Sequence, residues 1–333
     1  MSLLLAAILA FTYSPQDSCW SMVTLDNVPD RAVLFSQLAA REGGKAAVDF
    51  ASMLELSGRF GEAGRVYGIV LNSSSDSLLS GWIENRMMGV LALDTMIIIS
   101  ASIANTSEEE LADVTLEMPL PRSHEPYQQL EIVAGAFRER DNVLHSCIPL
   151  LPAGTSVVLP LVLHIRQRPH SFRPLPKRFE GSRGPVSLEE IARMLRSISV
   201  PESENGPGPC LEVAMRAESL GSLMGLDLTV TGGLLRSGGN LDFHAWNTVS
   251  GTGIPLDAVM FQSDSMRGIG HCPTDFIPLW NLEDTEGHEL SVYYPGSELQ
   301  VSIQISVSYA NAELINGLMN VFPLSLLKQI SGG

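Results

Sequence analysis

The sequence lacks several features that would place it in a specialised class of proteins. Of its 333 residues, 21 are basic and 37 are acidic, so the net charge is −16. Because such a surface repels phosphate groups, we do not expect a nucleic-acid partner. The longest apolar run, Leu3–Phe11, has nine residues, whereas a membrane-spanning helix needs roughly 20. The sequence therefore predicts a globular protein with no transmembrane span.

Cysteine is also scarce. The four cysteines, Cys19, Cys147, Cys210 and Cys272, are separated by long and irregular intervals, which is not the pattern of a disulfide scaffold. If Cys210 has to remain a free thiol, the other three can form at most one bridge within the chain. Cysteine usage therefore neither requires nor excludes an oxidising compartment.

The apolar run at the N-terminus predicts a signal peptide over residues 1–21. Leu3–Phe11 has the length of the apolar core of such a peptide, although only the α-amino group supplies positive charge ahead of it. Cleavage is expected between Ala10 and Ser21. We therefore predict an exported protein, periplasmic or extracellular; the alternative is a short buried helix or strand.

Residues 28–88 are predicted to be helical, because apolar residues recur there at spacings of three and four. Within them, Leu54–Leu71 resembles half of a tetratricopeptide unit in which Gly58 ends one helix. The next helix would pack through Ala63, Val66 and Tyr67. Because a single unit cannot stack into a solenoid, we favour a helical hairpin packed on the next domain over a peptide-binding repeat.

Residues 89–168 change to a β pattern. Three strands are expected, at Leu93–Ile103, Val114–Met118 and Ser156–Ile165. Pro160 indicates an edge position or a bulge in the third strand, because proline donates no backbone hydrogen bond. Short strands separated by turn signals predict an antiparallel β-sandwich.

A linker and two helices are expected next. Residues 169–186 are rich in proline and basic residues and are expected to form an exposed linker. Ser187 and Glu190 have the spacing of a capping box, which predicts the start of a helix. After a Gly-Pro-Gly-Pro segment stops the chain, a second helix is expected from Cys210 to about Met224.

Cys210 at a helix N-terminus has the surroundings of a reactive thiol. The helix dipole and the N–H groups of the first turn favour the thiolate and so lower the thiol pKa. The same N–H groups could donate to an oxyanion on an attacked carbonyl. Taken alone, however, a single cysteine is more often a small buried apolar residue.

Two strands further along supply the partners that such a thiol needs. Phe243–Val249 carries His244, and Ile254–Val259 carries Asp257 after a glycine turn. Antiparallel strands joined in this way can place the imidazole beside the carboxylate. A nucleophilic thiol needs a base, and the base needs a carboxylate that fixes its tautomer. The three side chains are therefore predicted to form a catalytic triad.

These residues resemble the transglutaminase-like superfamily, which is related to papain. The chain has GPC at Gly208–Cys210, HAW at His244–Trp246 and PLD at Pro255–Asp257. The resemblance extends over about Ser187–Tyr309. It implies an α+β protein in which a catalytic domain, residues 187–310, follows the β-sandwich. It also implies that Cys210 is the nucleophile, His244 the base and Asp257 the orienting carboxylate.

The resemblance implies acyl transfer from an amide or peptide substrate through a thioester on Cys210. The acyl group would pass to water or to another amine, and we favour hydrolysis because no feature of an amine site is visible. No metal or organic cofactor is expected, and the oligomeric state stays open. The alternative is a catalytically inactive binding or assembly module of the cell envelope.

Other candidate sites are weaker. His271, Cys272 and His288 could suggest zinc, but adjacent residues of an extended chain point to opposite faces, so we do not expect a metal site. The Gly232-Gly233 and Gly238-Gly239 pairs indicate turns rather than a phosphate site. Two further aspartates, Asp275 and Asp284, are expected to border the cleft or to face solvent.

The C-terminal part of the chain has a strand pattern followed by an apolar tail. Apolar and polar residues alternate over Leu299–Tyr309, which predicts a half-buried strand that completes the core sheet of the catalytic domain. In the tail, residues 311–333, the apolar stretch Leu314–Ile330 is expected to pack on the body of the protein rather than to contact a membrane.

Overall fold

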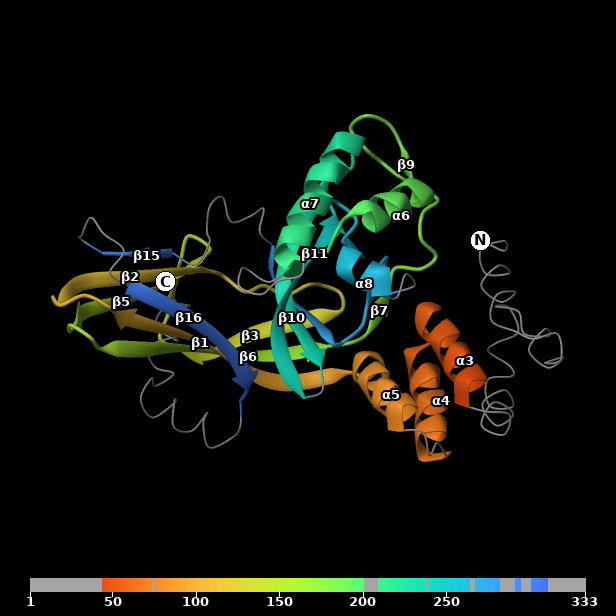
Figure 1. The fold of residues 1–333 in the computed structure, drawn as a ribbon, viewed down its shortest axis with the longest axis horizontal. Helices are drawn as coiled ribbons and strands as arrows, with labels where there is room; N and C mark the ends of the chain where they lie inside the picture. Colours follow the sequence, from red (N-terminus) through yellow and green to blue (C-terminus); the bar gives the residue numbers. More distant parts are fainter. Residues whose placement is uncertain are drawn as a thin grey trace. The chain divides into compact units, whose positions relative to one another are not determined.

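The structure is a computed structural model that describes residues 44–73, 75, 77–200, 209–237, 239–263, 267–281, 291–294 and 301–310. Several predictions lie wholly or partly outside the described residues: the signal peptide (1–21), Cys19, residues 28–43 of the helical region, residues 206–208 of the Gly-Pro-Gly-Pro segment, Gly238, Asp284, His288 and the tail (311–333). The described chain is a mixed α+β fold with antiparallel sheets (Figure 1). No helix in this part of the chain combines the length and apolar character needed to cross a lipid bilayer.

The chain divides into two compact units. The described part of the first contains three helical segments: α3 (Gly44–Leu56), α4 (Phe60–Ser73) and the first part of α5 (Ser77–Val90), which leaves this unit after Glu84. The three residues predicted to pack the second helix are all fully or nearly fully buried: Ala63, Val66 and Tyr67. Gly58 follows the first helix with a φ of +76°, a backbone conformation that favours glycine at helix ends.

The second unit contains Leu56–Gly58 and the chain from Asn85 onward. Its first part, here called the two-sheet region, has two four-stranded antiparallel sheets with the orders β16-β1-β6-β3 and β15-β2-β5-β4. Buried side chains from both sheets form one hydrophobic cluster, which is what holds them together. The strands are β1 (Leu93–Asn105), β2 (Leu111–Pro119), β3 (Gln128–Gly135), β4 (Arg138–Arg140), β5 (Val143–Leu151), β6 (Ser156–Gln167), β15 (Ser291–Tyr293) and β16 (Val301–Tyr309).

Pro160 lies in the central strand β6, not in an edge strand. Its carbonyl accepts a hydrogen bond of 2.9 Å from the N–H of Ala136, so the ring nitrogen faces the same neighbour and not β1. The last residue pair of β3 and β6 is Gly135 opposite Leu161, directly before Pro160 is reached. The pairing of these two strands is irregular, but the shift in register lies in β3, between Ile132 and Ala134. Proline is tolerated there because the ladder to β1 loses no donor.

A third sheet, here called the site sheet, has the order β12-β11-β10-β14. Its strands are β10 (Leu228–Ser237), β11 (Asn240–Val249), β12 (Ile254–Leu256) and β14 (Phe276–Asn281). Three helices pack with it: α6 (Leu188–Ser197), α7 (Pro209–Met224) and α8 (Ala258–Ser263). Figure 1 shows α7 lying along β10 and β11.

Several local predictions for this part match the structure. The capping box of Ser187 and Glu190 is present at the start of α6, and α7 spans the residues expected of the Cys210 helix. One prediction was wrong: Gly232 and Gly233 are not in a turn but inside β10, where the pairing with β14 shifts by one residue.

Residues 169–186, the expected linker, carry three two-residue strands instead of running free over the surface. β7 (His170–Ser171) pairs with β13 (His271–Cys272), and β8 (Arg178–Phe179) pairs with β9 (Val186–Ser187). The phenylalanine and valine of the second pair are both buried in the hydrophobic cluster that also contains α6, α7 and α8. This cluster explains why the segment is ordered despite its prolines and charges.

The strand expected at Leu299–Tyr309 is present as β16, but it does not complete the site sheet. It pairs with β1 instead, where it places Ile303 opposite Ile103 and Val307 opposite Ile99. The described chain beyond β14 thus returns to the two-sheet region. The strands of the predicted catalytic domain, residues 187–310, are therefore divided between the site sheet and the two-sheet region. Apolar cross-strand pairs with β1 account for this placement.

The two-sheet region and the site sheet share a core. Leu234, Leu241, Ile277 and Leu279 of the site sheet belong to the same hydrophobic cluster as β1, β2, β5 and β6. Three hydrogen bonds also join β14 to the two-sheet region: Gln128 Nε2 donates to the Pro278 carbonyl (2.8 Å), Gln167 Nε2 to the Phe276 carbonyl (2.6 Å), and Trp280 Nε1 of β14 to the Pro119 carbonyl (3.0 Å).

Candidate active site

Cys210 is the second residue of α7, which begins at Pro209. Proline suits the first position of a helix, because its fixed φ is helical and the N–H that it lacks would have no partner within the helix. The N–H groups of the first turn likewise have no carbonyl acceptor within the helix. The cysteine side chain is partly exposed, so its sulfur can be reached.

The sulfur lies at an open stretch of the edge of β11. β12 pairs with β11 only at residues 247–249, so none of the described strands pairs with residues 243–245 on that side. Cys210 Sγ is 3.9 Å from the carbonyl oxygen of Phe243, and the N–H groups of Ala245 and Leu211 point at the sulfur as donors. The tip of α7 therefore occupies the place that a longer β12 would have filled.

His244 and Asp257 are brought together by β11 and by the end of β12. Nε2 of the imidazole is 2.7 Å from Oδ2 of the carboxylate, and the two side chains are only 8% and 7% exposed. Asp257 was expected within a strand, but it follows β12 and precedes α8. Its second oxygen, Oδ1, accepts a hydrogen bond of 2.9 Å from the N–H of Met260, which is the bond of a helix N-cap.

The hydrogen bond to Asp257 decides which nitrogen of the imidazole faces the thiol. A carboxylate only accepts hydrogen bonds, so Nε2 carries a proton. Nδ1 is then the atom left to interact with Cys210, as an acceptor when the imidazole is neutral and as a donor when it is charged. The arrangement favours transfer of the thiol proton to Nδ1.

The electrostatics of the pair favour this transfer. Burial raises the pKa of the Cys210 thiol, but the hydrogen bond and charge interaction with His244 and the N–H groups of Ala245 and Leu211 outweigh it and bring the pKa below its ordinary value. Burial lowers the pKa of His244, but its interactions with Asp257 and Cys210 outweigh it and raise the pKa to about 9. Both directions favour a thiolate beside an imidazolium.

Two aromatic rings hold the imidazole. The ring of Trp246 stacks on His244 with centroids 5.7 Å apart, and Phe276 meets it edge-on at 5.4 Å. Gly233 lies opposite His244 on β10. A Cβ on this glycine would lie 2.2 Å from the Ile277 carbonyl oxygen and 2.8 Å from the Trp246 ring, so only glycine lets these groups approach.

A buried ion pair, Arg267–Asp275, contacts one of these rings, that of Phe276. Arg267 donates to both oxygens of Asp275, at 3.0 and 2.9 Å, and the two side chains are each 8% exposed. The guanidinium of Arg267 also lies over the ring of Phe276, 5.9 Å from its centroid. Asp275 was expected to border the cleft or to face solvent. It is instead buried and paired with Arg267, and this ion pair fixes the segment that carries Phe276.

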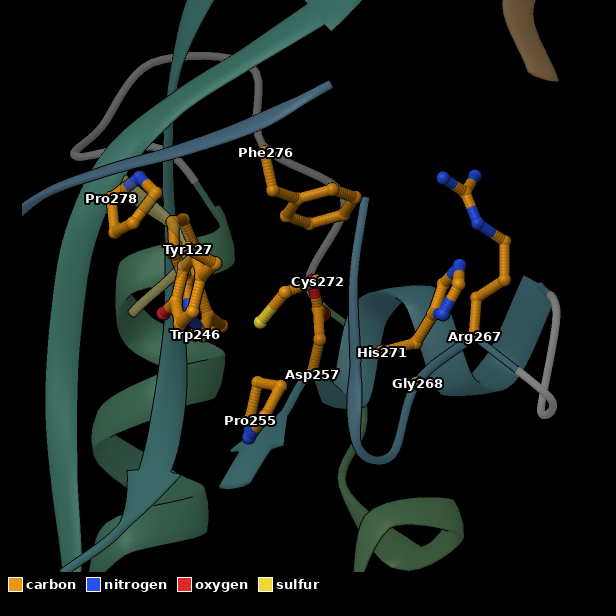
Figure 2. A pocket seen from close by; sticks show the side chains of 10 residues that line it. All are labelled: Tyr127, Trp246, Pro255, Asp257, Arg267, Gly268, His271, Cys272, Phe276 and Pro278. Carbon is orange, nitrogen blue, oxygen red and sulfur yellow. The ribbon is translucent and has the colours of Figure 1, made fainter. Parts of the chain in front are cut away.

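A small cavity borders the carboxylate side of the site, and Figure 2 shows its lining, which includes Tyr127, Trp246, Asp257 and Cys272 but neither Cys210 nor His244. Its volume of about 10 Å³ is about that of one water-sized sphere. The cavity is therefore too small for a substrate.

Cys272 and His271 do not form a site with the triad. In Figure 2 the Cys272 sulfur points toward Tyr127 and Trp246, while the His271 ring points away from it. Burial raises the pKa of the Cys272 thiol to about 12, which disfavours its thiolate form in the folded protein. The described residues hold no cluster of histidine, cysteine and acidic side chains that could bind a metal ion.

The structure thus brings Cys210, His244 and Asp257 together. It adds Phe276 and Arg267, which the sequence did not single out, and it places near His244 two residues that were expected to have other roles, Gly233 and Asp275. For Gly233 the available signal was the glycine itself, because a glycine inside a strand often marks a close approach of two chains. The other three become neighbours of His244 only through the folding of residues 267–276.

Comparisons with known proteins give little further information. No protein-family model matches the sequence, and no curated protein matches it either. A solved structure of a candidate cysteine protease from Cytophaga hutchinsonii is similar with a TM-score of 0.39 and 10% identity, over 67% of this chain and 94% of that chain. The interpretation of the site therefore depends on the geometry of its own residues.

Proposed function

We propose that this protein is a thiol-dependent acyltransferase of the transglutaminase-like superfamily, which cleaves amide bonds in peptide or protein substrates. The observation that carries the proposal is the hydrogen bond from His244 Nε2 to Asp257, because it leaves Nδ1 to take the proton of Cys210. Export of the protein is part of the proposal and is supported only by the apolar run Leu3–Phe11.

The first half of the reaction forms a thioester. The Cys210 thiolate attacks the amide carbonyl carbon, and the electron pair of the C=O bond moves to the oxygen. N–H groups at the start of α7 can donate to this oxyanion. The tetrahedral intermediate then expels the amine, which takes the Nδ1 proton of His244 as the C–N bond breaks. The acyl group remains on sulfur and the imidazole is neutral.

The second half releases the acyl group. Nδ1 of His244 removes a proton from a water molecule while the water oxygen attacks the thioester carbonyl. The C–S bond breaks, the carboxylic acid leaves, and the thiolate–imidazolium pair is restored. A second amine in place of water would give a cross-linked product by the same steps. We propose hydrolysis, because water is always present and the reaction then needs no second binding site.

The test is the rate at which iodoacetamide alkylates each cysteine of the full chain between pH 5 and 9, measured by mass spectrometry. We expect Cys210 to react under mildly acidic conditions much faster than Cys147, an exposed thiol on β5. His244→Ala removes the interaction that lowers the Cys210 pKa, so its labelling curve should move to higher pH, with about a tenfold loss of rate at acidic pH for each pKa unit.

The alternative function is a catalytically inactive binding or assembly module of the cell envelope. It predicts that Cys210 labels no faster than Cys147 at any pH, and that His244→Ala changes nothing. This outcome would contradict the enzymatic proposal and leave only the fold. A labelling difference that depends on His244 would exclude the inactive module.

A further inference from the structure

Phe243, whose main chain contacts the Cys210 sulfur, forms an aromatic pair with Trp280. The side chain of Phe243 is 42% exposed, and its ring stacks on Trp280 with centroids 6.4 Å apart and planes at 25°. Trp280 belongs to β14 and donates its Nε1 proton to the Pro119 carbonyl at 3.0 Å. The second ring is thus anchored to the two-sheet region, and it supports the first from behind.

The position of Phe243 ties this ring to the chemistry. Its own carbonyl oxygen is 3.9 Å from Cys210 Sγ. An acyl group held on the sulfur would therefore lie within about one side-chain length of Phe243. Along β11, which the structure describes in full, Phe243 is the only large apolar side chain that is more than a third exposed.

Other exposed apolar side chains nearby do not share these features. On α7, Met215 and Leu223 are 54% and 66% exposed, which is ordinary for isolated surface residues. Phe243 differs because a second ring fixes its orientation before any ligand arrives. A contact surface that is already ordered costs little conformational entropy when it binds.

We infer that Phe243, backed by Trp280, is a specificity-determining subsite, and that the preferred substrates carry a large apolar or aromatic side chain beside the attacked carbonyl. Stacking on a fixed ring favours such a side chain over hydrogen or a small polar group. The inference rests on the proposed function, because it assigns a substrate class to the same Cys210 site.

The experiment compares two thiol reagents of equal mechanism on the full chain: the chloromethyl ketones of N-acetyl-phenylalanine and N-acetyl-glycine. In both, the thiolate sulfur displaces chloride. The rate at Cys210 for each reagent is divided by the iodoacetamide rate, which corrects for the intrinsic reactivity of the thiol. We expect a phenylalanine-to-glycine ratio of about ten, which corresponds to about 1.4 kcal/mol.

Variants separate the subsite from other effects. Phe243→Ser should bring the ratio close to one, whereas Phe243→Tyr, which keeps the ring, should retain it. Met215→Ser is the matched control, because it removes an exposed apolar side chain from α7 without touching the aromatic pair. Thermal unfolding checks that each variant folds; if the serine variant does not, Phe243→Leu should give an intermediate ratio.

The outcomes distinguish the subsite from the function on which it rests. A wild-type ratio near one, or a ratio that Phe243→Ser leaves unchanged, overturns the subsite even if iodoacetamide still labels Cys210 rapidly. A loss of preference in Met215→Ser equal to that in Phe243→Ser also overturns it. If iodoacetamide labels Cys210 no faster than Cys147, the proposed function fails and the subsite fails with it.

Discussion

Cys210 and His244 owe their state to groups that are close in space and far apart in sequence. The sulfur is placed between an α-helix tip and the free edge of β11, where N–H groups favour its anionic form. The imidazole is buried, which alone would favour its neutral form, yet Asp257 and the thiol reverse this preference. The position of the imidazole in turn depends on Trp246, which can pack as it does only because residue 233 has no side chain.

At the residue scale we predict that Gly233→Ala is destabilising and impairs the site. The added Cβ has to displace the Ile277 carbonyl or the Trp246 ring, at a cost of about 1–3 kcal/mol in the free energy of unfolding. The displaced indole should also move His244, so Cys210 should be alkylated more slowly at acidic pH. Urea denaturation and iodoacetamide labelling measure the two effects.

The matched control for this variant is Gly61→Ala. Gly61 lies in α4, and a Cβ there would meet no atom within 4 Å. Alanine should be neutral or stabilising at this position, by up to about 1 kcal/mol. If Gly233→Ala is as stable as the wild type, the close packing around β10 does not position His244 as described.

Short elements carry the carboxylate side of the site. β12 has three residues and α8 has six, and Asp257 forms the junction between them. One carboxylate oxygen caps α8 through the N–H of Met260, and the other accepts the proton of His244 Nε2. Because each oxygen has its own partner, the start of α8 and the orientation of the imidazole are fixed together.

At the element scale, two substitutions of Asp257 should separate these roles. An asparagine at this position would still cap α8, so Asp257→Asn should cost less than about 1 kcal/mol from the cap. Its amide, however, would turn an N–H toward Nε2 and move the imidazole proton to Nδ1, which could no longer accept the proton of Cys210. We expect near-native stability with at least about a tenfold lower alkylation rate of Cys210 at mildly acidic pH.

Asp257→Ala should lose both functions. Removal of the cap costs about 1 kcal/mol, and a buried imidazole without its partner costs about 1–3 kcal/mol more. Denaturant midpoints of the two variants, compared with their labelling curves, measure the difference. Equal stabilities for asparagine and alanine would show that the bond to Met260 does not hold α8.

The whole second unit depends on one continuous core. Side chains from all three large sheets belong to the same hydrophobic cluster, and hydrogen bonds made by Gln128, Gln167 and Trp280 join β14 to the strands of the two-sheet region. The site sheet is therefore not an independent domain. Cys272, which is buried beside Tyr127, should become reactive only when this unit unfolds.

At the scale of the molecule we predict that Leu116→Ala exposes Cys272 more often. Leu116 lies in β2, is fully buried and belongs to the two-sheet region. Its truncation should cost about 2–5 kcal/mol, and the protection of Cys272 from a thiol reagent should fall by the same free energy. The measurement is the labelling rate of Cys272 as a function of urea concentration.

Val158→Ala is the control, because this residue of β6 is 55% exposed and its truncation should change stability by less than about 0.5 kcal/mol. Protection of Cys272 that stays native in Leu116→Ala, while the two-sheet region is measurably destabilised, would show that the two parts unfold separately.

Much of the fold could be predicted where local rules act alone. The capping box at Ser187, the start of α7 next to Cys210 and the strands around His244 follow from capping, proline placement and residue alternation, which operate within a few residues. The destination of β16 could not be predicted in this way, because its alternating pattern suits any sheet with an apolar face. The partner β1 is chosen by packing over the whole unit.

The candidate site divides along the same line. Residue types, together with the resemblance of the GPC, HAW and PLD motifs to the transglutaminase-like superfamily, selected Cys210, His244 and Asp257. Only the tertiary structure decided which imidazole nitrogen faces the sulfur, that Asp257 also caps a helix, and that Phe243 with Trp280 lies beside the thiol. These features depend on how side chains from distant segments are oriented relative to one another. That orientation is set by tertiary packing and cannot be read from the order of residues in the chain.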